Sequence, residues 1–273
     1  MLVTTDAIVL KSMKYRDTSR IVSVYTRDYG KLSVIAKGAR GPRSKFASAL
    51  EPLSRVVLVF YRTEHRDLHL VSQCDLRASY RRVTSDLDRM AAGLACLELI
   101  DQTAHDEERN DDLFGLTEHA LEILDAGNVR PEVVLTAFKL RMAAAIGFAT
   151  ALERCAVCGR PFRKGGCEAG WFRLATGSVM CLECQSRSRA TGSSGGADAA
   201  ALVRLSAQTH EALERCATAP LENLASLAWT TAQGNEIHNA ARLYLHHHIE
   251  HLRPLKSEEL LLRPVIRSST RRT

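Results

Sequence analysis

Residues 20–37 read RIVSVYTRDYGKLSVIAK, and this stretch decides the fold class of the first part of the chain. Apolar residues alternate with polar ones on both sides of Asp28-Tyr29-Gly30. Alternation with period two is typical of a strand with one buried face. A glycine that accepts a left-handed backbone suits the turn between two such strands. We therefore predict a β-hairpin with Gly30 at its turn.

Three more short runs before residue 80 are rich in Val, Ile, Leu or Tyr, and polar or Gly/Pro-containing stretches separate them. The strands expected from all these runs are residues 7–10, 20–26, 31–37, 55–61 and 68–74. Five strands within about 80 residues, with no long helix between them, favour a small closed barrel. An OB-like barrel is the simplest architecture of this size.

After residue 80 the apolar period changes to that of a helix, as in Leu87, Met90, Leu94 and Leu97. Further helices are expected at residues 113–124, 131–142, 199–216 and 235–252, with Pro131 and Asn235 suited to two of the helix starts. The predicted fold class is α+β: an N-terminal five-stranded OB-like β-barrel followed by an all-α domain that contains a four-cysteine zinc module.

The predicted organisation has four parts. Residues 1–80 form the OB-fold domain, 81–152 the first part of the helical domain, and 153–187 the zinc module. Residues 188–273 hold a flexible linker and the remaining helices, because residues 190–197, ATGSSGGA, have the composition of a flexible segment.

Four cysteines form two CxxC pairs with 22 residues between them: Cys155, Cys158, Cys181 and Cys184. Two thiolates from each of two tight turns complete a tetrahedral Zn²⁺ shell. Four protein ligands leave no open position for a substrate, so we expect one structural zinc ion. Redox-active dithiols are the alternative, but such a motif normally occurs once and beside a βαβ pattern, which is missing here.

The composition is that of an ordinary globular protein, with 45% hydrophobic and 25% charged residues. The first residues lack the apolar run of a signal peptide, and no run reaches the length of a membrane span. The other four cysteines are scattered along the chain. We therefore expect a cytoplasmic protein with reduced thiols and no membrane contact.

The net charge of +6 is unevenly distributed. Residues 1–80 contain 14 Lys+Arg and 7 Asp+Glu, a net charge of +7, so the rest of the chain has a net charge of −1. Such localisation indicates a polyanion-binding module on a near-neutral scaffold.

No acidic residue lies between Asp28 and Glu51, and the segment between them holds glycines that let the backbone approach phosphates. The residues expected to contact DNA are Lys31, Lys37, Arg40, Arg43 and Lys45, followed by Lys14 and Arg20. Four nearby aromatic residues are candidates for base stacking: Tyr15, Tyr25, Tyr29 and Phe46, although strand alternation favours a core position for Tyr25. The alternative is a solvated charged loop.

The motifs GxGxxG and HExxH are missing, and GxSxG is matched only by GSSGG at residues 192–196, inside the segment of flexible composition and not between a strand and a helix. Glu107-Glu108 and Asp111-Asp112 are expected in a solvated loop between helices. We therefore expect a binding protein with no catalytic residues. Two alternatives remain open, a metal-dependent nuclease that uses His247 and His251, and a scaffold whose basic loop binds an acidic protein.

Several short motifs, taken in order, resemble the RecO family of bacterial recombination mediators. They are DTSRIV at 17–22, AKGAR at 36–40, LEP at 50–52, FKLR at 138–141, the two CxxC pairs, Arg242, and LKS at 255–257. The resemblance spans nearly the whole chain, and the order and spacing of the motifs are more specific than any one of them.

The resemblance implies an OB-fold, a helical domain and a zinc module. It also implies a DNA repair protein that binds single- and double-stranded DNA, anneals complementary strands and is associated with the nucleoid. With RecR, such a protein helps to load RecA onto strands coated by single-strand-binding protein. Arg141, within FKLR, is then a candidate contact for the acidic tail of single-strand-binding protein; the alternative is an ordinary helix-surface arginine.

Overall fold

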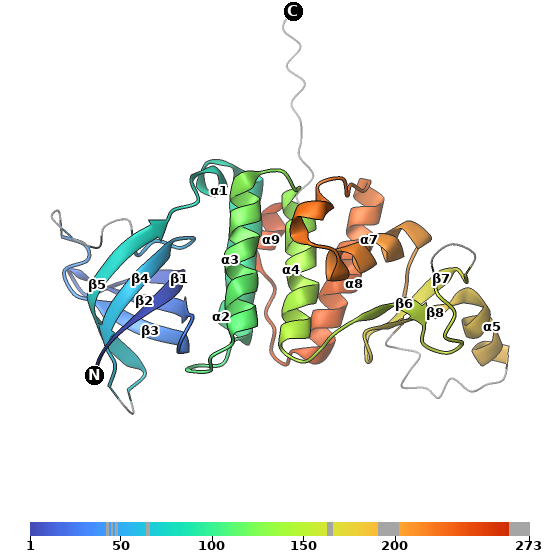
Figure 1. Cartoon of the computed structure of the whole chain (residues 1–273), viewed down its shortest axis with the longest axis horizontal. Helices are drawn as coiled ribbons and strands as arrows, with labels where there is room; N and C mark the ends of the chain where they lie inside the picture. The colour runs from blue at the N-terminus through green and yellow to red at the C-terminus, as the bar shows by residue number, and fades with distance from the viewer. Residues whose placement is uncertain are drawn as a thin grey trace, which may run out of the picture.

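The computed structural model describes residues 1–41, 44, 46, 49–63, 66–162, 166–190 and 202–261. Five strands form a closed barrel at one end of the molecule (Figure 1). Their bounds are β1 Leu2–Tyr15, β2 Ser19–Thr26, β3 Gly30–Ala36, β4 Arg55–Tyr61 and β5 Leu68–Ala78. All neighbours pair antiparallel except β3 and β5. The order β1-β2-β3-β5-β4 confirms the predicted five-stranded OB-like barrel.

The alternation in β2 places its side chains on two sides of the barrel wall. Val22 and Val24 point inward and are fully buried, whereas Ile21 and Ser23 point outward and are partly exposed. Tyr25 also points outward, yet it is buried because it packs with the core of the helical domain. The expectation that Tyr25 belongs to a core is confirmed.

The helical domain follows the barrel. Its elements are α1 Arg81–Ser85, α2 Leu87–Thr103, α3 Asp111–Ala126, α4 Pro131–Ala145, α7 Ala207–Thr218, the 3₁₀ helix η1 Leu221–Leu224, α8 Thr231–His248 and α9 Lys256–Leu261. A side chain caps the N-terminus of α2 and another that of α3. Asp86 accepts a hydrogen bond from the backbone N–H of Arg89, and Asn110 accepts one from the backbone N–H of Leu113. None of the described helices combines the length and apolar character that crossing a membrane requires.

A small sheet interrupts the helices at the end of the molecule away from the barrel (Figure 1). Its strands are β6 Ala151–Cys155, β7 Ala169–Arg173, β8 Ser178–Cys181 and β9 Leu202–Arg204, in the order β6-β8-β7-β9. Helix α5, Leu182–Ala190, follows β8 directly. Residues 191–197 of the expected linker lie outside the described residues.

Three local expectations were wrong. Residues 202–204 form β9 rather than the start of a helix, because they pair with β7, and α7 begins only at Ala207. Helix α8 begins before Asn235, because Thr230 and Gln233 form a capping box. Asp111 and Asp112 form the first turn of α3, where carboxylates favour the helix dipole.

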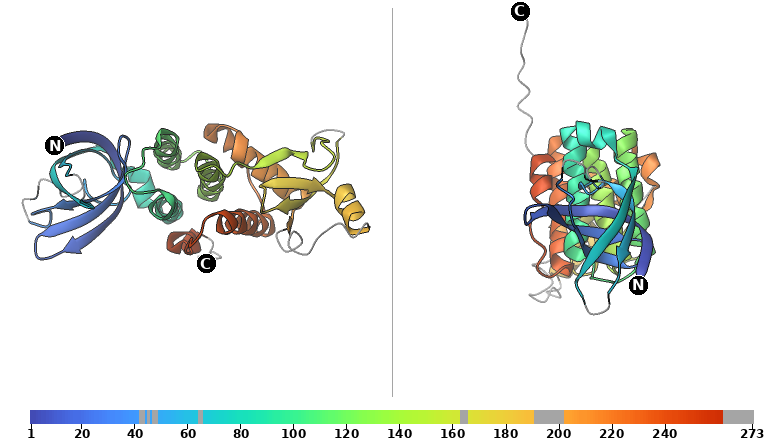
Figure 2. Two further views of the ribbon diagram at one scale, coloured as in Figure 1. Left: turned by 90° about the horizontal axis from the view of Figure 1, so that it is seen from below. Right: turned by 90° about the vertical axis from the view of Figure 1, so that its left-hand side faces the viewer.

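The barrel is fastened to the helical domain by charged groups. Glu118 of α3 accepts from Arg27 Nη2 at 3.1 Å and also forms an ion pair with Arg55. The backbone N–H of Glu107 donates to the carbonyl of Lys31 at 3.0 Å, which extends the barrel hydrogen bonds into the loop after α2. The left view of Figure 2 shows the helices between the barrel and the small sheet, and the right view shows the barrel in front of the helices.

Candidate functional site

The β1–β2 turn and the segment after β3 meet at one end of the barrel. Arg40 joins them: its N–H donates to the carbonyl of Thr18 at 3.0 Å, and its Nη1 donates to the carbonyls of Arg16 and Asp17 at 3.1 Å each. Lys37, three residues before Arg40, is exposed. The guanidinium of Arg40 therefore holds the turn in place and adds a positive charge beside it.

Lys14 and Arg20 face each other across the same hairpin. Lys14 is exposed, whereas Arg20 donates to Ser12 Oγ at 3.1 Å and forms an ion pair with Glu51 at 2.7 Å. The structure thus brings Lys14, Arg20, Lys37 and Arg40 to one end of the barrel, although Glu51 offsets part of the charge of Arg20.

The other three predicted cations are not part of this group. Lys31 is the second residue of β3, at the opposite end, where its Nζ donates to the carbonyl of Asp101 at 3.0 Å and lies 3.3 Å from an Asp106 oxygen. Its position supports the contact between the barrel and the helices. Arg43 and Lys45 lie outside the described residues.

The four aromatic candidates have different surroundings. Tyr25 and Phe46 are buried. Tyr29 packs edge-on against Phe60, with ring centroids 6.0 Å apart, beneath Arg62. Tyr15, at the end of β1, keeps an exposed ring, so among these four it is the one positioned to stack on a base.

Arg141 has partners inside the protein. Its Nε donates to the carbonyl of Cys216 at 3.1 Å, and its Nη2 donates to the carbonyl of Ala219. Both carbonyls belong to the C-terminal end of α7. Because a cation there satisfies free carbonyls and the helix dipole, Arg141 caps α7.

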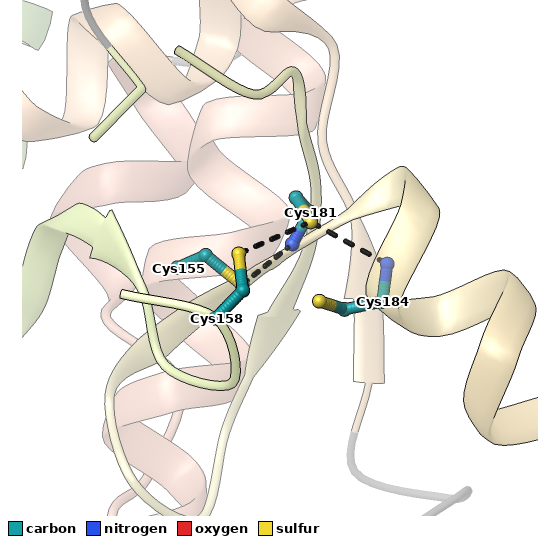
Figure 3. Close-up of side chains that lie close together, drawn as sticks. All are labelled: Cys155, Cys158, Cys181 and Cys184. Carbon is teal, nitrogen blue, oxygen red and sulfur yellow. Dashed lines mark hydrogen bonds between the residues drawn. The ribbon is translucent and has the colours of Figure 1, made fainter. Parts of the chain in front are cut away.

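The four CxxC cysteines converge on one point (Figure 3). Cys155 ends β6 and Cys158 follows in its turn, while Cys181 ends β8 and Cys184 lies in the first turn of α5. Their sulfurs all lie within 4.8 Å of one another, and Cys158 Sγ is 4.0 Å from Cys181 Sγ. A tetrahedral shell with Zn–S bonds of about 2.3 Å has ligand atoms about 3.8 Å apart. The spacing therefore fits a metal ion at the centre.

Hydrogen bonds around the sulfurs fit thiolates. The backbone N–H groups of Val157 and Cys181 both donate to Cys155 Sγ at 3.4 Å, and that of Cys184 donates to Cys181 Sγ at the same distance. A hydrogen bond from the Arg160 guanidinium lowers the pKa of Cys158 to about 6, whereas burial raises that of Cys184 to about 12. Thiolates are the form that binds metals, so the donor set suits a structural tetrathiolate site.

The histidines of α8 do not form a comparable group. The helix ends at His248, so His251 lies beyond it and the four-residue spacing from His247 no longer places both on one helix face. His248 Nε2 is 2.8 Å from the carbonyl of Leu174, and its ring stacks on Phe148. Within the described residues, the cysteine cluster is the one group of three or more His, Cys, Asp or Glu side chains arranged to hold a metal.

Sequence reasoning missed a pocket between α2, α4, α8 and the segment leading to α9. It has a volume of about 270 Å³, and its apolar lining includes Leu99, Leu245 and Leu255. Its charged lining consists of the cations Lys139, Arg242 and Arg253 and the carboxylates Glu258 and Glu259. Lys139, Arg242 and Leu255 each belong to a short motif of the family resemblance, but these motifs are distant in sequence, and only packing shows that they meet at one pocket.

Comparison with known proteins agrees with the two-part architecture. The family model described as "Recombination protein O N terminal" matches residues 1–80, and the one described as "Recombination protein O C terminal" matches residues 84–259. Three similar proteins, each named DNA repair protein RecO, come from Chlorobium limicola, Moorella thermoacetica and Salinibacter ruber.

The extent of each match differs. The Chlorobium limicola protein is 37% identical over 59% of this chain and 62% of its own length, slightly less than two thirds of that relative. The Moorella thermoacetica protein is 34% identical over 66% of this chain and 65% of its own. The Salinibacter ruber protein is 29% identical over 95% of this chain and 93% of its own length. Matched in order by both family models, this chain belongs to the RecO family of DNA repair proteins.

Proposed function

We propose that this protein is a recombination mediator that binds single- and double-stranded DNA at the basic end of its barrel and anneals complementary strands. The observation that supports this function best is the gathering of Lys14, Arg20, Lys37 and Arg40 around one turn. The resemblance to the family extends the proposal to RecR as a partner and to the loading of RecA onto strands coated by single-strand-binding protein.

Annealing by this route requires no catalytic side chain. Two strands repel each other through their phosphates, and a basic surface that holds both lowers that repulsion and raises their local concentration. Exposed Lys14 and Lys37 supply such contacts, while Arg40 adds charge at the turn it holds. Arg43 and Lys45 remain proposed contacts from the sequence alone. Lys31 is the weakest member of the set, because its ammonium group already contacts the Asp106 carboxylate and the Asp101 carbonyl.

The test is the double substitution Lys14→Ala/Lys37→Ala, assayed for oligonucleotide binding and strand annealing at several salt concentrations. Removing these ammonium groups should weaken binding and flatten the plot of log K against log[salt] by about 0.7 for each phosphate that is no longer neutralised on single strands. The matched control is Arg204→Ala/Lys256→Ala, which removes two exposed cations elsewhere. Equally weakened binding in both double variants would show that net charge, and not this surface, accounts for binding.

We place the acidic tail of single-strand-binding protein at the pocket beside α9 rather than at Arg141. An apolar lining beside the exposed cations Arg242 and Arg253 suits a peptide that combines acidic and apolar side chains, whereas Lys139 is already paired with Glu258. Arg242→Ala should weaken the binding of a labelled tail peptide, measured by fluorescence anisotropy. If Arg242→Ala binds the tail peptide as tightly as wild type does, the tail does not bind at this pocket.

We further propose that the cysteine cluster holds one Zn²⁺ ion and that this ion is structural. When bound, the metal would join the two turns; the residues that would hold it are Cys155, Cys158, Cys181 and Cys184. The DNA-binding end of the barrel lies at the opposite end of the molecule (Figure 1), so the metal has no direct part in holding strands there.

A further inference from the structure

The β1–β2 hairpin has two different faces near its turn. Residues in register across the strands share a face, and Lys14 pairs with Arg20 on the face that turns toward Glu51. Met13 pairs with Ile21 on the opposite face. Because side chains alternate along a strand, Lys11, Met13 and Tyr15 all lie on that second face. We call Lys11, Met13, Tyr15 and Arg16 the outer face of the hairpin.

The outer face exposes apolar surface between two cations. Met13 and Tyr15 are 48% and 36% exposed, so both present apolar surface to the solvent. The Arg16 guanidinium lies 5.3 Å from the centre of the Tyr15 ring, and Lys11 is exposed two residues before Met13. Aromatic rings interleaved with cations are how proteins bind single strands.

The turn that carries this face is held in a strained shape. Arg16 has φ 50°, a left-handed conformation that a residue with a side chain rarely adopts. The hydrogen bonds from Arg40 to the carbonyls of Arg16 and Asp17 stabilise it. Such strain persists when surrounding contacts require it and often accompanies function. Arg40 is therefore a positioning residue for Tyr15 as well as a source of charge.

We propose that the outer face binds single-stranded DNA, with a base stacked on Tyr15 and phosphates beside Lys11 and Arg16. This inference rests on the proposed DNA-binding function and adds a strand preference to it. In a duplex each base is already stacked and its face is covered, so a tyrosine ring adds affinity only for unpaired bases. The face is separate from the Lys14 and Arg20 face, which offers phosphate contacts to either form of DNA.

The experiment compares full-length wild type with Tyr15→Ala and Tyr15→Phe, using fluorescence anisotropy with a labelled oligothymidylate and with a duplex of equal length. Tyr15→Ala should weaken single-strand binding about 5- to 150-fold, the range for removal of one stacked base. Tyr15→Phe should retain most of the affinity, because a phenyl ring also stacks. The slope of log K against log[salt] should stay unchanged in both variants, since tyrosine contacts no phosphate charge.

Tyr61→Ala is the matched control, because Tyr61 is an exposed tyrosine (48%) on β4 of the same barrel. It should bind single strands as wild type does. Wild-type affinity in Tyr15→Ala, an equal loss on the duplex, or an equal loss in Tyr61→Ala would each overturn the inference. These results leave the proposed function intact, because that function is tested separately, by the binding and annealing of Lys14→Ala/Lys37→Ala compared with its control double variant.

Discussion

Lys139 of α4 and Glu258 of α9 form an ion pair inside the helical domain, although 119 residues separate them in sequence. Their side chains are only 3% and 9% exposed. His238 of α8 completes the group, with its Nδ1 2.8 Å from the same Glu258 oxygen. The carboxylate thus connects three helices and fixes the short final one, α9, against the domain.

Glu258→Gln should destabilise the protein by about 3–5 kcal/mol, because it leaves the buried Lys139 without a compensating charge. Urea-induced unfolding followed by circular dichroism measures this loss. Glu259→Gln is the control, since Glu259 is exposed and has the same helical surroundings; it should change stability by less than about 0.5 kcal/mol. Equal effects of the two substitutions would contradict the assigned role of Glu258.

The same group predicts a loss of stability in acid. Burial by itself raises the pKa of Glu258, but the hydrogen bond from His238 and the charge of Lys139 outweigh burial and hold the pKa below its ordinary value of 4.5. A carboxyl whose pKa is lower in the folded than in the unfolded protein stabilises the fold above the unfolded value, and this stabilisation is lost as pH falls through the folded value. The difference in unfolding free energy between wild type and Glu258→Gln should therefore shrink as pH falls below about 5 and through the lower pKa of the folded protein. A difference that stays constant over this range would argue against the ionised pair.

The barrel and the cysteine cluster were predictable because their signals are local. Alternation around Gly30 and the CxxC spacing each depend on residues close in sequence, and the structure confirms both the strands and the convergence of the four cysteines. The start of α8 was predictable in principle, because Thr230 and Gln233 have the spacing of a capping box.

Other features depend on contacts between distant segments. Residues 202–204 are too few to show a period, and they become a strand only because β7 offers a partner. Lys31 resembles the other basic residues in sequence, but the loop after α2 supplies Asp106 to pair with it. The pocket cations likewise come from separate elements. In each case tertiary packing decides the role of the residue, and the sequence carries no local sign of it.

Gly30→Ala should disturb the contact between the barrel and the helices. Gly30 has φ 66°, and a Cβ atom there would lie 2.1 Å from the carbonyl oxygen of Glu108. Gly38 has nearly the same φ, 70°, but nothing lies within 4 Å of its Cβ position. Gly38→Ala should thus cost about 1–2 kcal/mol for its backbone conformation alone.

In Gly30→Ala the clash adds about 1–3 kcal/mol or more to the same backbone cost. Thermal unfolding of the two variants measures the difference, and hydrogen exchange at residues 104–110 should rise only in Gly30→Ala. Equal unfolding temperatures would show that the loop after α2 moves aside without cost.

The substitution Arg141→Ala should lower the free energy of unfolding. Removing the guanidinium leaves the carbonyls of Cys216 and Ala219 without their partner at the end of α7, a loss of about 1–3 kcal/mol for groups in a partly buried site. Arg242→Ala is the contrast, because Arg242 is exposed beside the pocket and should leave stability nearly unchanged. If Arg141→Ala unfolds like wild type but loses the binding of a labelled acidic tail peptide, then Arg141 is a partner contact, as the family resemblance implies, and not a cap.

Removal of one cysteine ligand should lower the metal content and leave DNA binding nearly unchanged. Cys158→Ser leaves three thiolates, so the metal content should fall well below one equivalent and hydrogen exchange should rise in β6 to β8. Cys167→Ser is the matched control, because Cys167 is buried beside the cluster but is not one of its four ligands; it should retain one equivalent of zinc. Oligonucleotide binding by the barrel should change little in either variant, since the cluster lies at the other end of the molecule.

Loss of zinc from Cys167→Ser as complete as that from Cys158→Ser would mean that the ligand set is wrong. A large loss of DNA binding in Cys158→Ser alone would mean that the zinc module itself contacts the strand.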